Sequence, residues 1–172
     1  RIEIWTDDLV RLKTAPFPTG EQSLVVAYYA SAEIGAFLAL GWEVPSNILD
    51  LFIVFRSLLN GKCAPFGFSL LGALSYFSLP SISDSDKDEG RKLALRGGPW
   101  TQEEKLYLLD YCQSDVDALI PLFQKLLPYI DWPRILLHGA YTASAARIER
   151  NGIPIDTDIL FTLAQKWSDI QK

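Results

Sequence analysis

The sequence has few of the residues that bind zinc or form disulfide frameworks. Its 172 residues include one histidine and two cysteines, Cys63 and Cys112. A structural zinc site uses four cysteine or histidine ligands, and a disulfide scaffold needs more cysteines in a shorter chain. The composition therefore argues against both classes. It favours a reducing compartment, which we expect to be the cytoplasm.

Long apolar runs are also absent. No stretch approaches the roughly 18 consecutive apolar residues of a membrane-spanning helix. Residues 1–9 lack the apolar region and the cleavage site of a secretory signal. We therefore expect no membrane partner. With 49% hydrophobic and 22% charged residues, the chain has the composition of a globular domain with its own core.

Basic residues do not outnumber acidic ones. The chain has 16 lysine and arginine residues against 21 aspartate and glutamate residues, a formal net charge of −5. A protein that grips a phosphate backbone unaided usually presents a basic face. A nucleic-acid function would therefore need bound cations, or basic surface from another part of a longer protein.

Hydrophobic patterns place strands in the first third of the chain and helices after it. Short strands are predicted at residues 2–5, 24–28 and 47–50. Helices are predicted at residues 31–41, 51–60, 66–79 and 131–151, after Thr101 and after Asp156. Pro121 should kink or interrupt the helix that begins after Thr101.

The order of these elements predicts an α/β fold in which a small sheet is covered by helices. Three short strands are few for a domain of this length. We therefore expect further strands before Arg1.

Capping residues predict where several helices begin. Asp50 is placed to cap the helix that follows it, and Thr101 with Glu104 forms a capping box. Ser83 or Ser85 would cap a solvated helix in the polar stretch that surrounds them.

The segment from residue 110 to 119 places a tyrosine and a carboxylate on one helix face. Tyr111 and Asp115 stand four residues apart, so their side chains are neighbours on a helix. One interpretation is a phenol hydrogen-bonded to a carboxylate at the helix surface. The other is a metal site, in which Asp115 binds a metal ion and Tyr111 orients a water molecule that the metal acidifies. The remaining candidates are interpreted as solvated acids, Asp110 and Asp117, and as packing residues, Cys112 and His138.

Glu33 is the second candidate ligand. It follows the strand at 24–28 and opens the next helix. An acid at a strand-to-helix exit points over the end of the sheet, where α/β proteins bind ligands. Mg²⁺ prefers such oxygen ligands. The alternative is a carboxylate that only interacts favourably with the helix dipole.

Three features in order resemble a known family. Tyr111 and Asp115 match a Tyr-x-x-x-Asp motif, and residues 25–42 line up with a strand followed by Asn-x-x-aromatic-Asp. Residues 146–156, ARIERNGIPID, resemble the sequence where an exonuclease domain leads into a polymerase domain. Over about residues 1–160 the chain thus resembles the 3′→5′ proofreading exonuclease domain of family A DNA polymerases, bacterial DNA polymerase I and its phage relatives.

The chain departs from the family pattern in two ways. Glu33 stands where the family has aspartate, and Tyr29 and Ala32 replace the asparagine and the aromatic residue. The first motif, Asp-x-Glu on the opening strand, is absent, and the acids at residues 7–8 have the wrong spacing to replace it. We therefore expect that Arg1 falls after this motif, which agrees with the shortage of strands.

The resemblance implies a ribonuclease H-like exonuclease fold, with a small mixed sheet that lacks its first strands. It divides the chain into an exonuclease-like domain at residues 1–130 and a helical connection to a polymerase domain at residues 131–172. It also implies two Mg²⁺ or Mn²⁺ ions near Asp115 and Glu33, with Tyr111 beside the attacking water. The implied substrate is the single-stranded 3′ end of DNA, and the implied setting is a bacterial or phage-infected cell.

Because the first motif is absent, we expect weak or no nuclease activity from this chain alone. A degenerate, non-catalytic scaffold beside a polymerase remains open. So do a stand-alone RNA-trimming nuclease of the same superfamily and an unrelated helical interaction domain.

Overall fold

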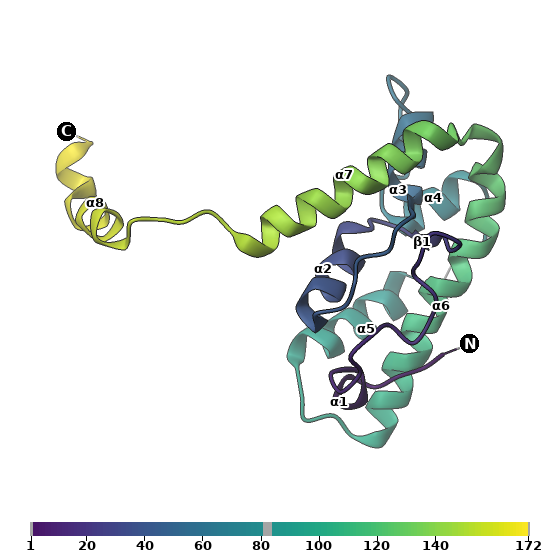
Figure 1. Cartoon of the computed structure of the whole chain (residues 1–172), viewed down its shortest axis with the longest axis horizontal. Coiled ribbons are helices and arrows are strands. Elements are labelled where there is room, and N and C mark those ends of the chain that lie inside the picture. Colours follow the sequence, from purple (N-terminus) through teal and green to yellow (C-terminus); the bar gives the residue numbers. More distant parts are fainter. Residues whose placement is uncertain (1, 81–83, 172) are drawn as a thin grey trace.

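The computed structural model describes residues 2–80 and 84–171 (Figure 1). Within these ranges the elements follow the order α1 (Thr6–Leu9), β1 (Val25–Ala27), α2 (Ser31–Leu40), β2 (Ile48–Asp50), α3 (Leu51–Leu58), α4 (Leu70–Tyr76), α5 (Asp84–Arg96), α6 (Gln102–Leu126), the short 3₁₀ helix η1 (Leu127–Tyr129), α7 (Trp132–Asn151) and α8 (Thr157–Ile170). The predicted α/β class is confirmed, with helices predominating. Of the two predicted caps in the polar stretch, Ser83 and the side chain of Ser85 lie outside the described residues.

The described sheet has two parallel strands, β1 and β2, in which Val25 pairs with Ile48 and Ala27 pairs with Asp50. Parallel strands require a crossover, and α2 supplies it. This helix ends at Gly41, whose positive φ of 71° suits the left-handed position after a helix. The carboxyl ends of both strands therefore meet at one edge of the sheet.

The predicted strand at residues 2–5 is wrong. No described strand pairs with this segment, which instead leads into α1. The Trp5 ring packs edge-on against Trp100 at 5.4 Å between ring centroids. Alternation of side chains alone cannot form a strand, since the backbone groups also need a partner strand.

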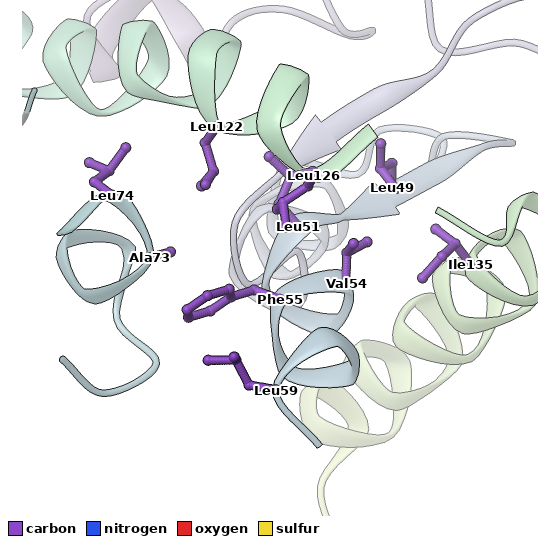
Figure 2. Packing of buried hydrophobic residues seen from close by; sticks show 10 residues of the cluster. All are labelled: Leu49, Leu51, Val54, Phe55, Leu59, Ala73, Leu74, Leu122, Leu126 and Ile135. Atoms are coloured by element: carbon purple, nitrogen blue, oxygen red, sulfur yellow. The ribbon is translucent and has the colours of Figure 1, made fainter. Parts of the chain in front are cut away.

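The main core lies between α3, α4 and α6, around the end of β2 (Figure 2). Its centre is Phe55 of α3, which is fully buried and faces Ala73 and Leu74 of α4. Leu122 and Leu126 close the core from the last turns of α6, and both are 0% exposed.

The long helix α6 begins as predicted and continues past its proline. Thr101 and Glu104 form the expected capping box, in which each side chain bonds the other residue's backbone N–H. Pro121 lies inside the helix, which nevertheless extends to Leu126. Of the two predicted effects of Pro121, a kink or an interruption, the interruption does not occur. Burial of Leu122 beside it holds the last turns in place despite the missing backbone hydrogen bond.

The segment predicted as a helical connection has two different parts. Helix α7 packs against α2 and β2, and Gly139 approaches so closely that a Cβ there would collide with the carbonyl oxygen of Ile48. Helix α8, capped by Asp156, lies apart from the body in Figure 1, and all its residues are exposed. None of the helices in the described ranges combines the length and apolarity that crossing a membrane demands.

Candidate functional site

Tyr111 and Asp115 lie together on α6, as predicted. Both side chains are half-buried, and the ring of Tyr111 fills the space left by Gly90 of α5, where a Cβ would lie 2.7 Å from a ring carbon. Burial raises the pKa of Tyr111, and the charge of Asp115 raises it further, while Arg91 on α5 opposes the change. The phenol is therefore held in its protonated form at neutral pH, in which it can donate a hydrogen bond.

The other acids on this part of α6 are exposed. Asp110 and Asp117 both face solvent, which confirms the prediction for them, and the carboxylate of Asp117 accepts a hydrogen bond from Gln113. Cys112 was predicted to pack inside the fold, and this prediction is wrong because the residue is exposed. Partial desolvation nevertheless raises the pKa of the Cys112 thiol, and the charge of Asp115 adds to this effect.

Glu33 lies in the first turn of α2, directly after β1, at the edge where both strands end. Desolvation raises the pKa of Glu33, its own backbone N–H opposes this change, and the charge of Asp50 contributes to the increase. The side chain is still exposed, so solvent screens much of this interaction. The position at a strand-to-helix exit agrees with the prediction.

Asp50 has a larger role than the predicted helix cap. It is 4% exposed and caps α3 by accepting a hydrogen bond from the backbone N–H of Phe52 at 3.0 Å. Its carboxylate also accepts hydrogen bonds from the N–H groups of Tyr29 and Ala30, both at 2.9 Å. One carboxylate thus ties the end of β2 to the connection between β1 and α2. These two hydrogen bonds join segments about twenty residues apart, so no local sequence pattern signals this role.

These hydrogen bonds hold Tyr29 in an unusual backbone conformation. Its φ is 70°, in the left-handed region that asparagine tolerates and bulky residues rarely adopt. Tyrosine is a bulky residue, so the backbone here has a conformation that its side chain disfavours. Such strain persists only where surrounding contacts fix the backbone, and Asp50 provides them.

The structure divides the predicted site residues into two groups, one around Glu33 on α2 and one around Asp115 on α6. The charge of Asp50 acts on Glu33, whereas the charge of Asp115 acts on Tyr111 and Cys112. Helix α2 packs mainly against α7, and α6 packs against α3, α4 and α5. Among the residues that the structure describes, no three histidine, cysteine, aspartate or glutamate side chains are grouped to hold a metal ion. Glu33 and Asp115 thus do not by themselves fit a two-ion centre.

The arrangement offers two kinds of carboxylate. Asp50 has both oxygens occupied by backbone N–H groups. Glu33 and Asp115 are less enclosed: the pKa of Glu33 itself is raised by desolvation, and the charge of Asp115 raises the pKa of Tyr111. Comparisons of the chain with models of protein families, with curated proteins and with solved structures find no match.

Proposed function

We propose that the chain is part of a family A DNA polymerase and carries most of its 3′→5′ exonuclease domain. The reaction of the complete domain is hydrolysis of the 3′-terminal phosphodiester of DNA during proofreading, in the cytoplasm of a bacterial or phage-infected cell. The observation that carries this proposal is the half-buried pair of Tyr111 and Asp115 on one face of α6, with the charge of Asp115 acting on the phenol. Glu33 at the exit of β1 supports it.

The fold proposal is a ribonuclease H-like sheet in which β1 and β2 are two of several strands. Two features support it, the parallel pairing of these strands and the acid at the end where both of them stop. Among the described residues, β1 pairs with β2 on one side only. The other edge of β1 is where further strands of such a sheet would add.

Each of the three side chains has a distinct role in this proposal. Tyr111 keeps its hydroxyl proton and can hydrogen-bond the attacking water. Asp115 and Glu33 are carboxylates suited to divalent cations, and such cations would supply water activation and charge stabilisation when bound. Because these two acids are too few for two ions, we propose that further carboxylates come from residues outside this chain.

A second candidate is a non-catalytic scaffold domain beside a polymerase. The backbone of Tyr29 supports it, since asparagine, which the resemblance implies at this position, suits the left-handed conformation and tyrosine does not. The two candidates make different predictions for the same residue, Asp115, which only the exonuclease requires for chemistry.

The test measures shortening of a single-stranded DNA oligonucleotide labelled at its 5′ end, with Mg²⁺ or Mn²⁺ present. The chain alone should shorten it weakly or not at all. The chain joined to a segment that carries the first-motif acids should remove nucleotides from the 3′ end. This activity should be lost in Asp115→Ala and kept in Asp117→Ala, which removes an exposed acid from the same helix.

Two outcomes would overturn parts of the proposal. Robust shortening by the chain alone that disappears in Asp115→Ala would show that this chain already holds a complete site. A longer protein that binds DNA but never shortens it would favour the scaffold.

A further inference from the structure

A cleft of about 620 Å³ opens between α3 and α7, beside the carboxyl ends of the strands. Its volume falls within the roughly 300–1,000 Å³ that is typical of small-molecule sites. Its walls are mainly one face of α3 and one face of α7. Glu33, Tyr111 and Asp115 do not line it. The cleft thus lies apart from these three side chains, while Tyr29 and Asp50, whose charge acts on Glu33, are part of its lining.

Two arginines reach the cleft from different helices. The guanidinium of Arg56 on α3 lies over the rings of Phe52 and Phe68, at 5.6 and 5.1 Å from their centroids, and these contacts hold it in position. Arg134 in the first turn of α7 pairs with Asp131 at 3.4 Å, but both side chains are well exposed. An exposed pair contributes little stability, so Arg134 can exchange this partner for a ligand. Two guanidinium groups suit a phosphate.

Aromatic rings stand on both sides of the cleft. Tyr141 on α7 is 70% exposed, and Tyr29 at the end of β1 is 56% exposed. Tyr29 is held in place by Asp50 and by edge-on contact with Phe52, at 5.3 Å between ring centroids. Exposed aromatic faces are suited to stacking against a nucleobase, and of these two rings Tyr29 is the one whose contact with Phe52 limits its movement. The same lining carries hydroxyl groups that can bond a sugar or a base edge.

Charge is arranged unevenly along the cleft. Val54 of α3 and Ile135 of α7 belong to the same buried core, so the first turn of α7 lies alongside α3. Arg134 and Arg56 are therefore on neighbouring parts of these two helices. Glu149 also lines the cleft, but at a rise of about 1.5 Å per residue it lies about 22 Å from Arg134 along α7. The end of the cleft with the two arginines therefore favours a phosphate group, and the end with Glu149 disfavours a second phosphate group. The net charge of −5 further disfavours a long nucleic-acid strand.

We propose that this cleft binds a single nucleotide unit. Arg56 and Arg134 contact the phosphate, and the base lies against Tyr141 and Tyr29. The nucleotide is either free in solution or the terminal unit of a single strand, and the chemistry of recognition is the same for both.

The test measures binding of thymidine monophosphate to the whole chain by calorimetry, in EDTA so that no metal-dependent cleavage occurs. Arg134→Gln and Tyr141→Ala should each weaken binding by about tenfold, as expected for loss of a charged contact or a stacked base. Both side chains are exposed, so neither change should unfold the protein. The matched controls Lys62→Gln and Tyr129→Ala remove an exposed lysine and an exposed tyrosine outside the cleft and should leave binding unchanged.

Inorganic phosphate and thymidine, tested separately, should each bind at least about tenfold more weakly than the nucleotide, since each makes half of the contacts. Tighter binding of a short oligothymidylate would identify a strand end as the source, and tighter binding of the monophosphate would identify a free nucleotide. Nucleotide binding that is undetectable, or that both cleft variants leave unchanged, would overturn the proposal. Asp115→Ala should not alter this binding, so the result is independent of the exonuclease test.

Discussion

Replacing Asp50 should loosen the connection between β1 and α2 in a way that can be assigned to single hydrogen bonds. One carboxylate oxygen accepts from the N–H groups of Tyr29 and Phe52, and the other accepts from Ala30. Asp50→Asn can keep the first oxygen as its carbonyl, but its amide group then faces the N–H of Ala30. Leaving one buried donor without a partner costs about 1–3 kcal/mol of the free energy of unfolding.

Asp50→Ala removes all three hydrogen bonds together. Contributions of neighbouring bonds do not add fully, and single substitutions rarely cost more than about 5 kcal/mol. We therefore expect a loss of about 4 kcal/mol in the free energy of unfolding. The strained backbone of Tyr29 would also lose the hydrogen bonds that Asp50 accepts from the N–H groups of Tyr29 and Ala30. The loop from β1 to α2 should therefore open locally.

Urea denaturation followed by tryptophan fluorescence measures the loss, and backbone hydrogen exchange shows where it occurs. In Asp50→Asn, exchange should quicken most at Ala30 and least at Phe52. The control is Asp156→Ala, which removes the cap of α8. Because α8 lies apart from the core, this change should leave the main transition in place. A cost below about 1 kcal/mol for Asp50→Ala, with unchanged exchange, would refute the reasoning.

Three further predictions concern packing and charge. Gly139→Ala should lower the free energy of unfolding by about 2 kcal/mol or more, because the new Cβ collides with the backbone of β2. Gly35→Ala places its Cβ in open space and should raise the free energy of unfolding by at most about 1 kcal/mol. Urea denaturation of both variants measures the difference. Asp115→Asn should lower the pKa of Cys112, so alkylation of this thiol, measured with the other cysteine replaced by serine, should reach half its maximal rate at lower pH; an unchanged pH profile would contradict the coupling. Glu33→Gln should raise the free energy of unfolding above the folded-state pKa of Glu33 and leave it unchanged below the unfolded-state pKa, since a raised pKa makes ionisation destabilising as pH rises; a gain confined to acidic pH would speak against it.

Features set by local sequence were predicted well. The caps at Asp50, Thr101 and Asp156 begin helices where expected, because a capping side chain and its N–H partners lie within a few residues of each other. The neighbouring positions of Tyr111 and Asp115 follow from helix periodicity for the same reason.

Features set by distant partners were missed. The hydrogen bonds from Tyr29 and Ala30 to Asp50 join segments about twenty residues apart, and no local pattern encodes them. The segment at residues 2–5 alternates like a strand, yet whether it forms one depends on a neighbouring strand. The continuation of α6 past Pro121 depends likewise on the core that buries the following turn.

The most direct test of the exonuclease proposal compares two aspartates on α6 in one assay. The chain joined to a segment that carries the first-motif acids is given single-stranded DNA with Mg²⁺ or Mn²⁺, and release of the 3′-terminal nucleotide is timed. The proposal predicts that Asp115→Ala abolishes release while Asp117→Ala retains it. Equal release by both variants would contradict the role of Asp115, and with it the assignment of the pair on α6.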